Sequence, residues 1–118
     1  MNLELFDVVR VPFPFSDSFL SKKRPALVLS SCQNYNRCHV VMAMITSAKH
    51  SNFPLDVLIQ DSDKAGLPKS CLVRMKLFTI DSKLIDKKIG RLCINDQKKV
   101  IISLKKLMPI LFGNPLEI

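Results

Sequence analysis

The chain has 118 residues, of which 47% are hydrophobic, and carries a formal net charge of +8 with a pI of about 9.6. Its length suits one folded domain over residues 1–118, and its apolar content excludes a disordered chain. The 18 Lys and Arg against 10 Asp and Glu favour a polyanionic partner over a merely solubilising surface. No uncharged stretch approaches the ~20 residues of a membrane-spanning helix, and no signal peptide is visible. We therefore expect a cytoplasmic protein.

The first predicted strand, residues 6–15, alternates between two faces. Val9, Val11, Phe13 and Phe15 form the odd face, which we expect to be buried, and Val8 and Arg10 lie on the outer face with Pro12 and Pro14. Because proline cannot donate a ladder hydrogen bond, the second half of this strand should lie at a sheet edge. The polar loop 16–23 follows.

Residues 24–46 predict a β-hairpin. Its strands are residues 25–30 and 39–46, and the polar segment 33–37 forms the turn. The second strand is apolar on both faces, which indicates a central position in the sheet. Folding the hairpin about Tyr35 pairs residues whose numbers have the same sum, so Arg24 lies opposite Thr46. A guanidinium beside a hydroxyl at the open end of a hairpin is suited to binding phosphate.

The remaining segments continue the mainly β pattern. Residues 55–59, 71–78 and about 89–92 read as short strands, and residues 61–69 as a turn. In the 71–78 strand, Arg74 and Lys76 project from the face opposite an apolar row. That row comprises Cys71, Val73, Met75 and Leu77.

A terminal helix is predicted from apolar residues that recur at helical spacing. They are Val100, Leu104, Leu107, Met108 and Leu111, which we expect to pack in the core. Asn95 suits the N-cap, Asp96 suits the positive end of the helix dipole, and Pro109 limits the last turn. The expected fold is therefore mainly β with a helix (α+β): a small, strongly bent antiparallel sheet or barrel covered by the amphipathic C-terminal helix.

The four cysteines form no C-x-x-C pair. Cys32, Cys38 and His39 could bind zinc, but their spacing matches no familiar site, so we expect buried or idle thiols and no metal or cofactor. His39 lies at the far end of the hairpin from Arg24 and is interpreted as structural. His50, in the loop after Thr46, is nearer and is interpreted as a solvated loop residue.

Several segments, taken in order, resemble the PemK/MazF family of toxin endoribonucleases. The similar segments are V-R-V-P-F-P-F-S-D at 9–17, K-R-P-A-L-V-L-S at 23–30, I-T-S at 45–47, G-L at 66–67, V-R at 73–74, L-F-T-I-D at 77–81 and K-I-G-R-L at 88–92. No piece is specific alone, but together they cover nearly the whole chain. Two departures stand out: Met75 and Lys76 follow Arg74 where several members carry an acidic residue, and the loop 16–23 has no histidine.

The resemblance implies a compact SH3-like barrel, a homodimer, and a growth-inhibiting toxin that cleaves single-stranded RNA sequence-selectively and without metal. It also implies an antitoxin whose acidic C-terminal segment covers the RNA groove. The family's catalytic arginine and threonine fall on Arg24 and Thr46. The expected RNA-binding residues are Ser16, Lys22, Lys23, Ser47, Arg74 and Lys76.

Other readings remain open at this point. Arg24 could bridge to Asp17 on an ordinary surface, and Thr46 could simply end a strand. The fold is also similar to that of non-enzymatic gyrase poisons, which contact their target through terminal residues. Here the Arg24–Thr46 pair and the unremarkable end, residues 113–118, favour RNA as the target. A third reading is an RNA-binding relative that has lost cleavage.

Overall fold

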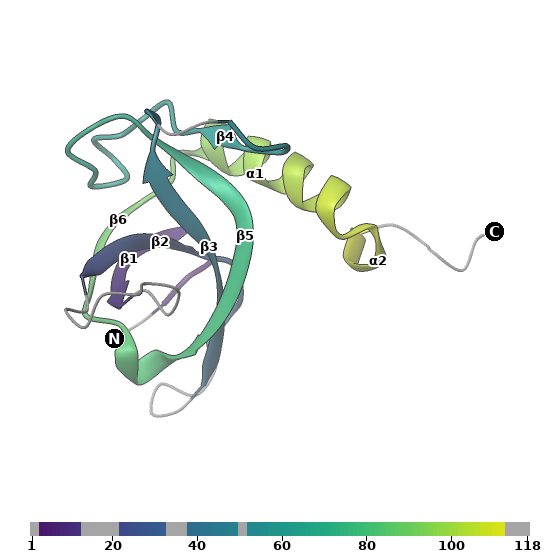
Figure 1. The fold of residues 1–118 in the computed structure, drawn as a ribbon. Helices are drawn as coiled ribbons and strands as arrows, with labels where there is room; N and C mark the ends of the chain where they lie inside the picture. Colours follow the sequence, from purple (N-terminus) through teal and green to yellow (C-terminus); the bar gives the residue numbers. More distant parts are fainter. Residues whose placement is uncertain (1–2, 13–21, 33–37, 50–51, 113–118) are drawn as a thin grey trace.

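The computed structural model describes residues 3–12, 22–32, 38–49 and 52–112, which form one curled antiparallel sheet and a C-terminal helical segment (Figure 1). The strands are β1 (Asp7–Pro12), β2 (Lys23–Val28), β3 (His39–Ser47), β4 (Val57–Leu58), β5 (Cys71–Asp81) and β6 (Lys87–Arg91). The helices are the 3-10 turn η1 (Ser82–Leu84), α1 (Ile94–Leu107) and α2 (Pro109–Phe112). The strand order is β4-β5-β3-β2-β1-β6, and the sheet closes into a half-barrel, so the predicted mainly β architecture is confirmed.

The central position predicted for the second hairpin strand is confirmed, because β3 lies between β2 and β5. Its two faces belong to different hydrophobic clusters. Even-numbered residues such as Val40 and Met42 join one cluster, and odd-numbered residues such as Ala43 and Ile45 join the other. The second cluster also contains Val100 of α1, so the helix covers one face of the sheet. Burial on both faces explains the continuous apolar run in this strand.

The predicted hairpin register is also confirmed where the structure pairs β2 with β3. Ala26 lies opposite Met44, and Val28 lies opposite Met42. The backbone N–H of Leu29 donates to the carbonyl of Val41 at 2.9 Å and continues the same register. The turn residues 33–37 lie outside the described part of the chain.

The first strand differs in part from the prediction. Val9 and Val11 are fully buried as expected, but Val8 on the supposed outer face is also 0% exposed, because it packs in the cluster that includes α1. β1 is flanked by β2 and β6, so it is not an edge over its whole length. The described β6 pairing nevertheless stops at Arg10–Lys87, before Pro12. Phe13 and Phe15 lie outside the described residues.

Helix α1 begins one residue after Cys93, so the predicted N-cap at Asn95 is wrong. Asp96 does lie in the first turn, but its buried carboxylate accepts hydrogen bonds from the backbone N–H groups of Gln60 and Asp61, at 3.1 Å each. The aspartate therefore joins the helix to the loop after β4 and satisfies two amides there. The predicted stop before Pro109 is confirmed, with Met108 as the C-cap.

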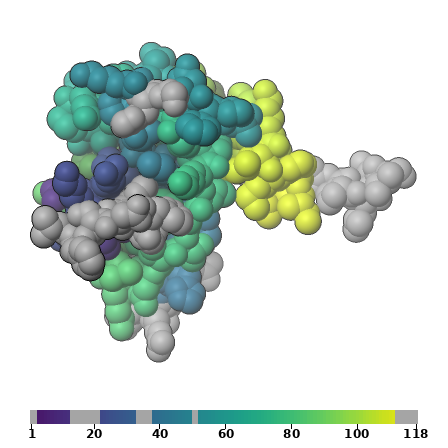
Figure 2. All heavy atoms as spheres, in the orientation of Figure 1, coloured from purple at the N-terminus to yellow at the C-terminus, as the bar shows by residue number. Residues whose placement is uncertain are grey.

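Only the first half of the apolar helix stripe packs in the core. Val100 and Leu104 are buried, whereas Leu107 is 37% and Leu111 63% exposed. Figure 2 shows why: the C-terminal helical segment stands out to one side of the strands. No helix in the described part of the chain is long and apolar enough to cross a membrane.

Two glycines bring the 61–69 turn against β6. Gly66 has a φ of +74°, and a Cβ built there would lie 1.9 Å from the carbonyl oxygen of Ile89. A Cβ on Gly90 would lie 2.2 Å from the backbone of Ala65. The contact therefore requires glycine on both sides. This close contact holds the 61–69 turn, which ends at Lys69, against β6.

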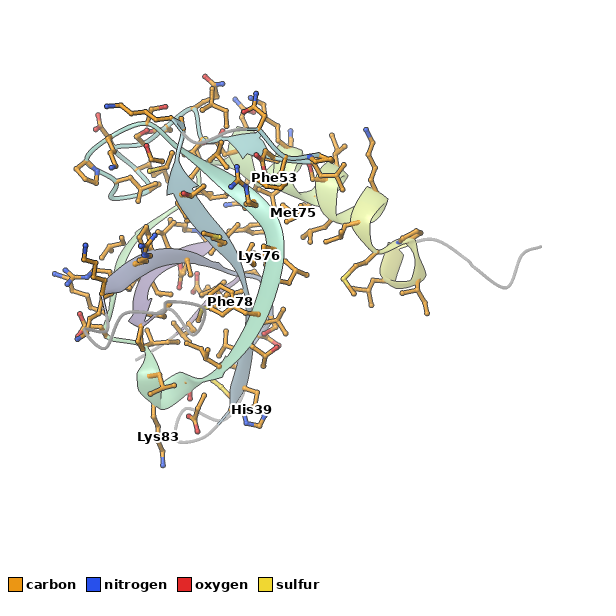
Figure 3. The ribbon with its side chains drawn as sticks, viewed as in Figure 1. His39, Phe53, Met75, Lys76, Phe78 and Lys83 are labelled. Atoms are coloured by element: carbon orange, nitrogen blue, oxygen red, sulfur yellow. A yellow bond between two sulfur atoms is a disulfide. The ribbon has the colours of Figure 1, made fainter. Side chains whose placement is uncertain are left out.

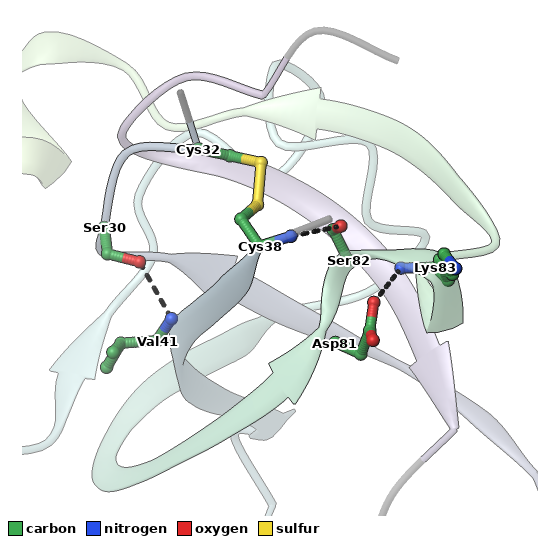
Figure 4. Close-up of a disulfide and its surroundings, with 7 residues drawn as sticks. All are labelled: Ser30, Cys32, Cys38, Val41, Asp81, Ser82 and Lys83. Carbon is green, nitrogen blue, oxygen red and sulfur yellow. Dashed lines mark hydrogen bonds between the residues drawn. A yellow bond between two sulfur atoms is a disulfide. The ribbon is translucent and has the colours of Figure 1, made fainter. Parts of the chain in front are cut away.

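Cys32 and Cys38 form a disulfide at the closed end of the hairpin, so the expectation of idle thiols is wrong for this pair (Figure 4). Their Cα atoms are 5.9 Å apart, within the usual range for a disulfide. Neighbouring bonds hold the same end: the N–H of Val41 donates to the Ser30 hydroxyl at 2.8 Å, and the N–H of Cys38 donates to the Ser82 hydroxyl at 3.3 Å. Cys71 and Cys93 are free thiols.

We predict that Cys32→Ala combined with Cys38→Ala lowers the free energy of unfolding by about 2 kcal/mol, the chain-entropy value for so short a loop. Urea unfolding with and without dithiothreitol measures this free energy. The reductant should lower the free energy of unfolding of the unmodified protein and leave that of the double variant unchanged. Equal unfolding midpoints for the oxidised protein and the variant would contradict the prediction.

Candidate phosphate-binding pocket

The open end of the β2–β3 hairpin carries a surface pocket of about 600 Å³. Its lining residues come from the start of β2, the end of β3, the start of β5 and the middle of β1. They are Arg10, Lys22, Lys23, Arg24, Pro25, Ile45, Thr46, Ser47, Lys69 and Cys71. Half of these ten residues are Lys or Arg, so the pocket is strongly cationic. It is suited to a group with several negatively charged oxygens.

Arg24 and Thr46 meet in this pocket, as the hairpin register predicted. Arg24 is exposed on β2 and pairs with Val11 of β1, while Thr46 is 8% exposed and pairs with Leu72 of β5. Along their strands both share parity with Ala26 and Met44, so both side chains project from one face of the sheet. Pro25 sets the conformation beside Arg24, since a residue before proline is held extended.

The sequence-predicted residues divide into three groups. Lys22, Lys23 and Ser47 line the same pocket as Arg24. Arg74 and Lys76 line a second, smaller pocket instead. Ser16 lies outside the described residues, as do Asp17 and His50. His39 is exposed at the opposite end of β3, near Lys83 in Figure 3, so it is remote from the pocket as expected.

Two cationic residues of the pocket, Arg10 and Lys69, were not predicted as site residues from the sequence. Arg10 was placed on the outer face of its strand, but it pairs with Pro25 and reaches the pocket around the start of β2. Lys69 enters because β5 pairs with β3 in a register that sets Cys71 opposite Ser47. The strand after Lys69 was visible in the sequence, but its partner and register were not.

Asp86 lies just before β6 and organises the cations at one side of the pocket. Its carboxylate is 3.0 Å from the Lys23 ammonium and 3.8 Å from Nε of Arg10. The hydrogen bond from Lys23 is the main reason that the pKa of Asp86 is lowered, and the charges of Lys23, Arg10 and Lys87 add to it. Asp86 therefore stays ionised at neutral pH and orients Lys23 and Arg10.

Cys71 offers no base to the pocket. Burial raises the pKa of its thiol above the usual range, and Lys69 opposes the shift only in part. The thiol therefore remains protonated at neutral pH. The described lining residues include no histidine and no carboxylate, so what they supply is positive charge and hydroxyl groups.

Arg74 is held by the carboxylate of Asp56, which was not predicted as a site residue from the sequence. Its Nε and Nη2 donate to the two carboxylate oxygens of Asp56 at 3.2 and 3.0 Å. Both side chains are shielded, with 13% and 8% exposure. The acidic neighbour of Arg74 in this chain therefore comes from the segment before β4, 18 residues earlier.

The structure therefore shows a small β-barrel-like fold with a cationic pocket at the open end of the β2–β3 hairpin. Residues 4–108 match the family described as PemK-like, MazF-like toxins of type II toxin-antitoxin systems. The chain belongs to this family. Among curated proteins, none matches the sequence.

Solved structures support the same fold. The chain is similar to an endoribonuclease in complex with its cognate antitoxin from a mycobacterial species, with a TM-score of 0.68, 16% identity, and coverage of 90% of this chain and 94% of that one. It is similar to the Mycobacterium tuberculosis toxin MazF-mt6, with a TM-score of 0.67, 18% identity, and coverage of 87% and 96%. The chain is also similar to a further mycobacterial endoribonuclease, with a TM-score of 0.65, 16% identity, and coverage of 92% of this chain and 94% of that one.

Proposed function

We propose that this protein is a toxin that cleaves single-stranded RNA sequence-selectively and is neutralised by a cognate antitoxin. The observation that carries the proposal is the pocket in which Arg24 and Thr46 meet among further cations. Family membership supports the toxin class. The similar mycobacterial structures, named as endoribonucleases and in one case bound to an antitoxin, support the reaction and the partner.

The chemistry that suits the pocket is attack by the RNA's own 2′-hydroxyl on the adjacent phosphorus. The O2′–P bond forms and the P–O5′ bond breaks, which leaves a 2′,3′-cyclic phosphate and a 5′-hydroxyl. The 2′-oxygen loses its proton and the 5′-oxygen gains one. The phosphoryl oxygens gain negative charge in the transition state, so fixed donors aimed at them lower the barrier.

Arg24 is the residue best suited to this task. Its planar guanidinium can donate two parallel hydrogen bonds to phosphate oxygens. The Thr46 hydroxyl can donate to the same oxygens or orient the arginine. Lys22, Lys23 and Lys69 place further positive charge around the phosphate. These groups bind the substrate and stabilise charge; the general base is assigned to none of them.

The antitoxin segment that would inhibit this site is acidic. The net charge of +8 and the five cations of the pocket favour an acidic peptide that competes with RNA for the same groove. Such competition weakens as the salt concentration rises, because both ligands bind through screened charges.

We predict a homodimer, because side chains of α1 and α2 such as Leu107, Ile110 and Leu111 leave apolar surface in water that a second copy could cover. Sedimentation velocity at micromolar concentration should give the mass of two chains. A single species with the 13.4 kDa mass of one chain would contradict the prediction.

We predict that cleavage needs no divalent metal. Mg²⁺ and Mn²⁺ prefer carboxylate and other oxygen ligands, and the described lining residues of the pocket carry an excess of positive charge and no carboxylate. Cleavage of a long RNA should therefore proceed at the same rate in EDTA. Loss of activity on chelation, with recovery on adding Mg²⁺ or Mn²⁺, would show that the reaction uses a metal.

We predict that Arg24→Ala lowers the cleavage rate by about 10²-fold or more, the cost of losing one preorganised donor. Arg24→Lys should be almost as defective, since it keeps the charge but loses the fork. Thr46→Ala should give a similar but milder defect. RNA affinity should fall much less than turnover in each case.

The matched control is Lys83→Gln, which also removes one positive charge but lies on η1 at the far end of the sheet. Single-turnover kinetics on one RNA separates binding from chemistry. Arg24→Lys cleaving as fast as the unmodified protein would refute the catalytic role, and an equal defect in Lys83→Gln would point to non-specific charge.

A further inference from the structure

The segment before β4 builds an exposed aromatic platform beside the cationic pocket. Phe53 is 55% exposed although it is a large apolar side chain. It borders a second pocket of about 420 Å³ on the β4 side of β5, and Figure 3 shows Phe53 near Met75, with Lys76 lower on β5. The pocket is lined by Met44, Phe53, Pro54, Arg74, Met75 and Lys76.

The platform is held rigidly from one side. The Arg74 guanidinium lies over the Phe53 ring, 4.3 Å from its centroid, and Asp56 fixes that guanidinium with two hydrogen bonds. The Asp56 carboxylate also accepts from the N–H of Phe53 at 2.8 Å, and the N–H of Asp56 donates back to the carbonyl of Phe53 at 3.2 Å. Leu55 within this turn has a φ of 70°. The turn therefore orders a ring that remains largely in water.

The second pocket lies next to the cationic pocket on the same face of the sheet. Met44 pairs with Arg74 and borders the second pocket, while Thr46, two residues further along β3, borders the first. Two residues of a strand span roughly 7 Å, and both side chains project to the same side. The pocket that Phe53 borders therefore begins next to the pocket that Arg24 lines.

The two pockets differ in chemistry. The first is dominated by cations, whereas in the second Asp56 pairs with Arg74 and the other lining groups are a ring, a proline and two methionines, with Lys76 as a further cation. Flat aromatic surface beside a positive charge binds the bases of single-stranded nucleic acid, because every base has a π-face and a neighbouring phosphate.

We propose that Phe53 and the pocket around it form a nucleobase-stacking subsite, which holds a base close to the phosphate bound at Arg24. This inference rests on the proposed RNA cleavage and adds the residue that would position the substrate strand. Arg74 acts through Phe53 by bracing the ring, and Lys76 contacts the adjoining phosphate.

The test uses the absence of tryptophan from the sequence. Phe53→Trp introduces a single fluorophore at the platform, and Ile102→Trp introduces one on α1 at a position with the same 55% exposure. The probe is a single-stranded RNA with 2′-O-methyl groups, which cannot attack its own phosphates. Saturating RNA should strongly quench the fluorescence of the Phe53→Trp variant and leave that of the Ile102→Trp variant unchanged. Equal quenching in both variants, or none in Phe53→Trp, would overturn the subsite.

A second measurement separates stacking from charge and from folding. Phe53→Ala should weaken binding of the same RNA by about 5- to 150-fold and leave the salt dependence of binding unchanged. Lys76→Gln should lower that salt dependence, and Ile102→Ala should change neither quantity. Thermal unfolding and sedimentation of Phe53→Ala are recorded alongside. A change in oligomeric state that accounts for the lost affinity would assign the ring to a protein interface and overturn the proposal.

The outcomes also distinguish the subsite from the function on which it rests. If the unmodified protein cleaves RNA but the Phe53 variants bind the 2′-O-methyl RNA normally, the subsite is wrong and the proposed function stands. If the unmodified protein neither cleaves RNA nor binds the 2′-O-methyl RNA, both are wrong.

Discussion

The antiparallel register between β2 and β3 is the constraint on which both ends of the hairpin depend. Pairing Ala26 with Met44 brings Arg24 and Thr46 to one pocket at the open end. The same register sets Cys32 opposite Cys38 at the closed end, where they form a disulfide. A slip of one residue would turn the side chains of a strand to the opposite face. Both faces of β3 are buried in different clusters, so such a slip would disrupt packing on each side.

Features that depend on neighbouring segments could be predicted from the sequence. The hairpin register followed from the position of its turn, and the end of α1 followed from Pro109. The disulfide was also within reach, because the register that paired Arg24 with Thr46 places Cys32 and Cys38 at equivalent facing positions. The expected cytoplasmic location favoured free thiols instead, because a reducing cytosol disfavours disulfides.

Features that depend on long-range pairing could not be predicted in this way. Lys69 joins the pocket through the pairing of β5 with β3, and nothing local to Lys69 specifies that register. Asp96 looked like a residue that favours a helix start, but its carboxylate binds amides of the loop after β4. Arg74 was expected to bind RNA from an exposed strand face, yet Asp56 lies beside it and shields it. In each case the partner lies many residues away.

The position of Asp56 explains why two neighbouring pockets on one face of the sheet differ in chemistry. Without a carboxylate, Arg74 would extend the cationic surface of the Arg24 pocket along β5, and the face would bind polyanions with little preference for position. With its charge paired to Asp56 and its guanidinium laid over Phe53, the same arginine supports an apolar surface. A buried ion pair is a poor source of stability, because desolvation offsets its attraction. Its contribution here is to order the Phe53 ring, and under the proposed function this ring would give a bound RNA strand a fixed point beside Arg24.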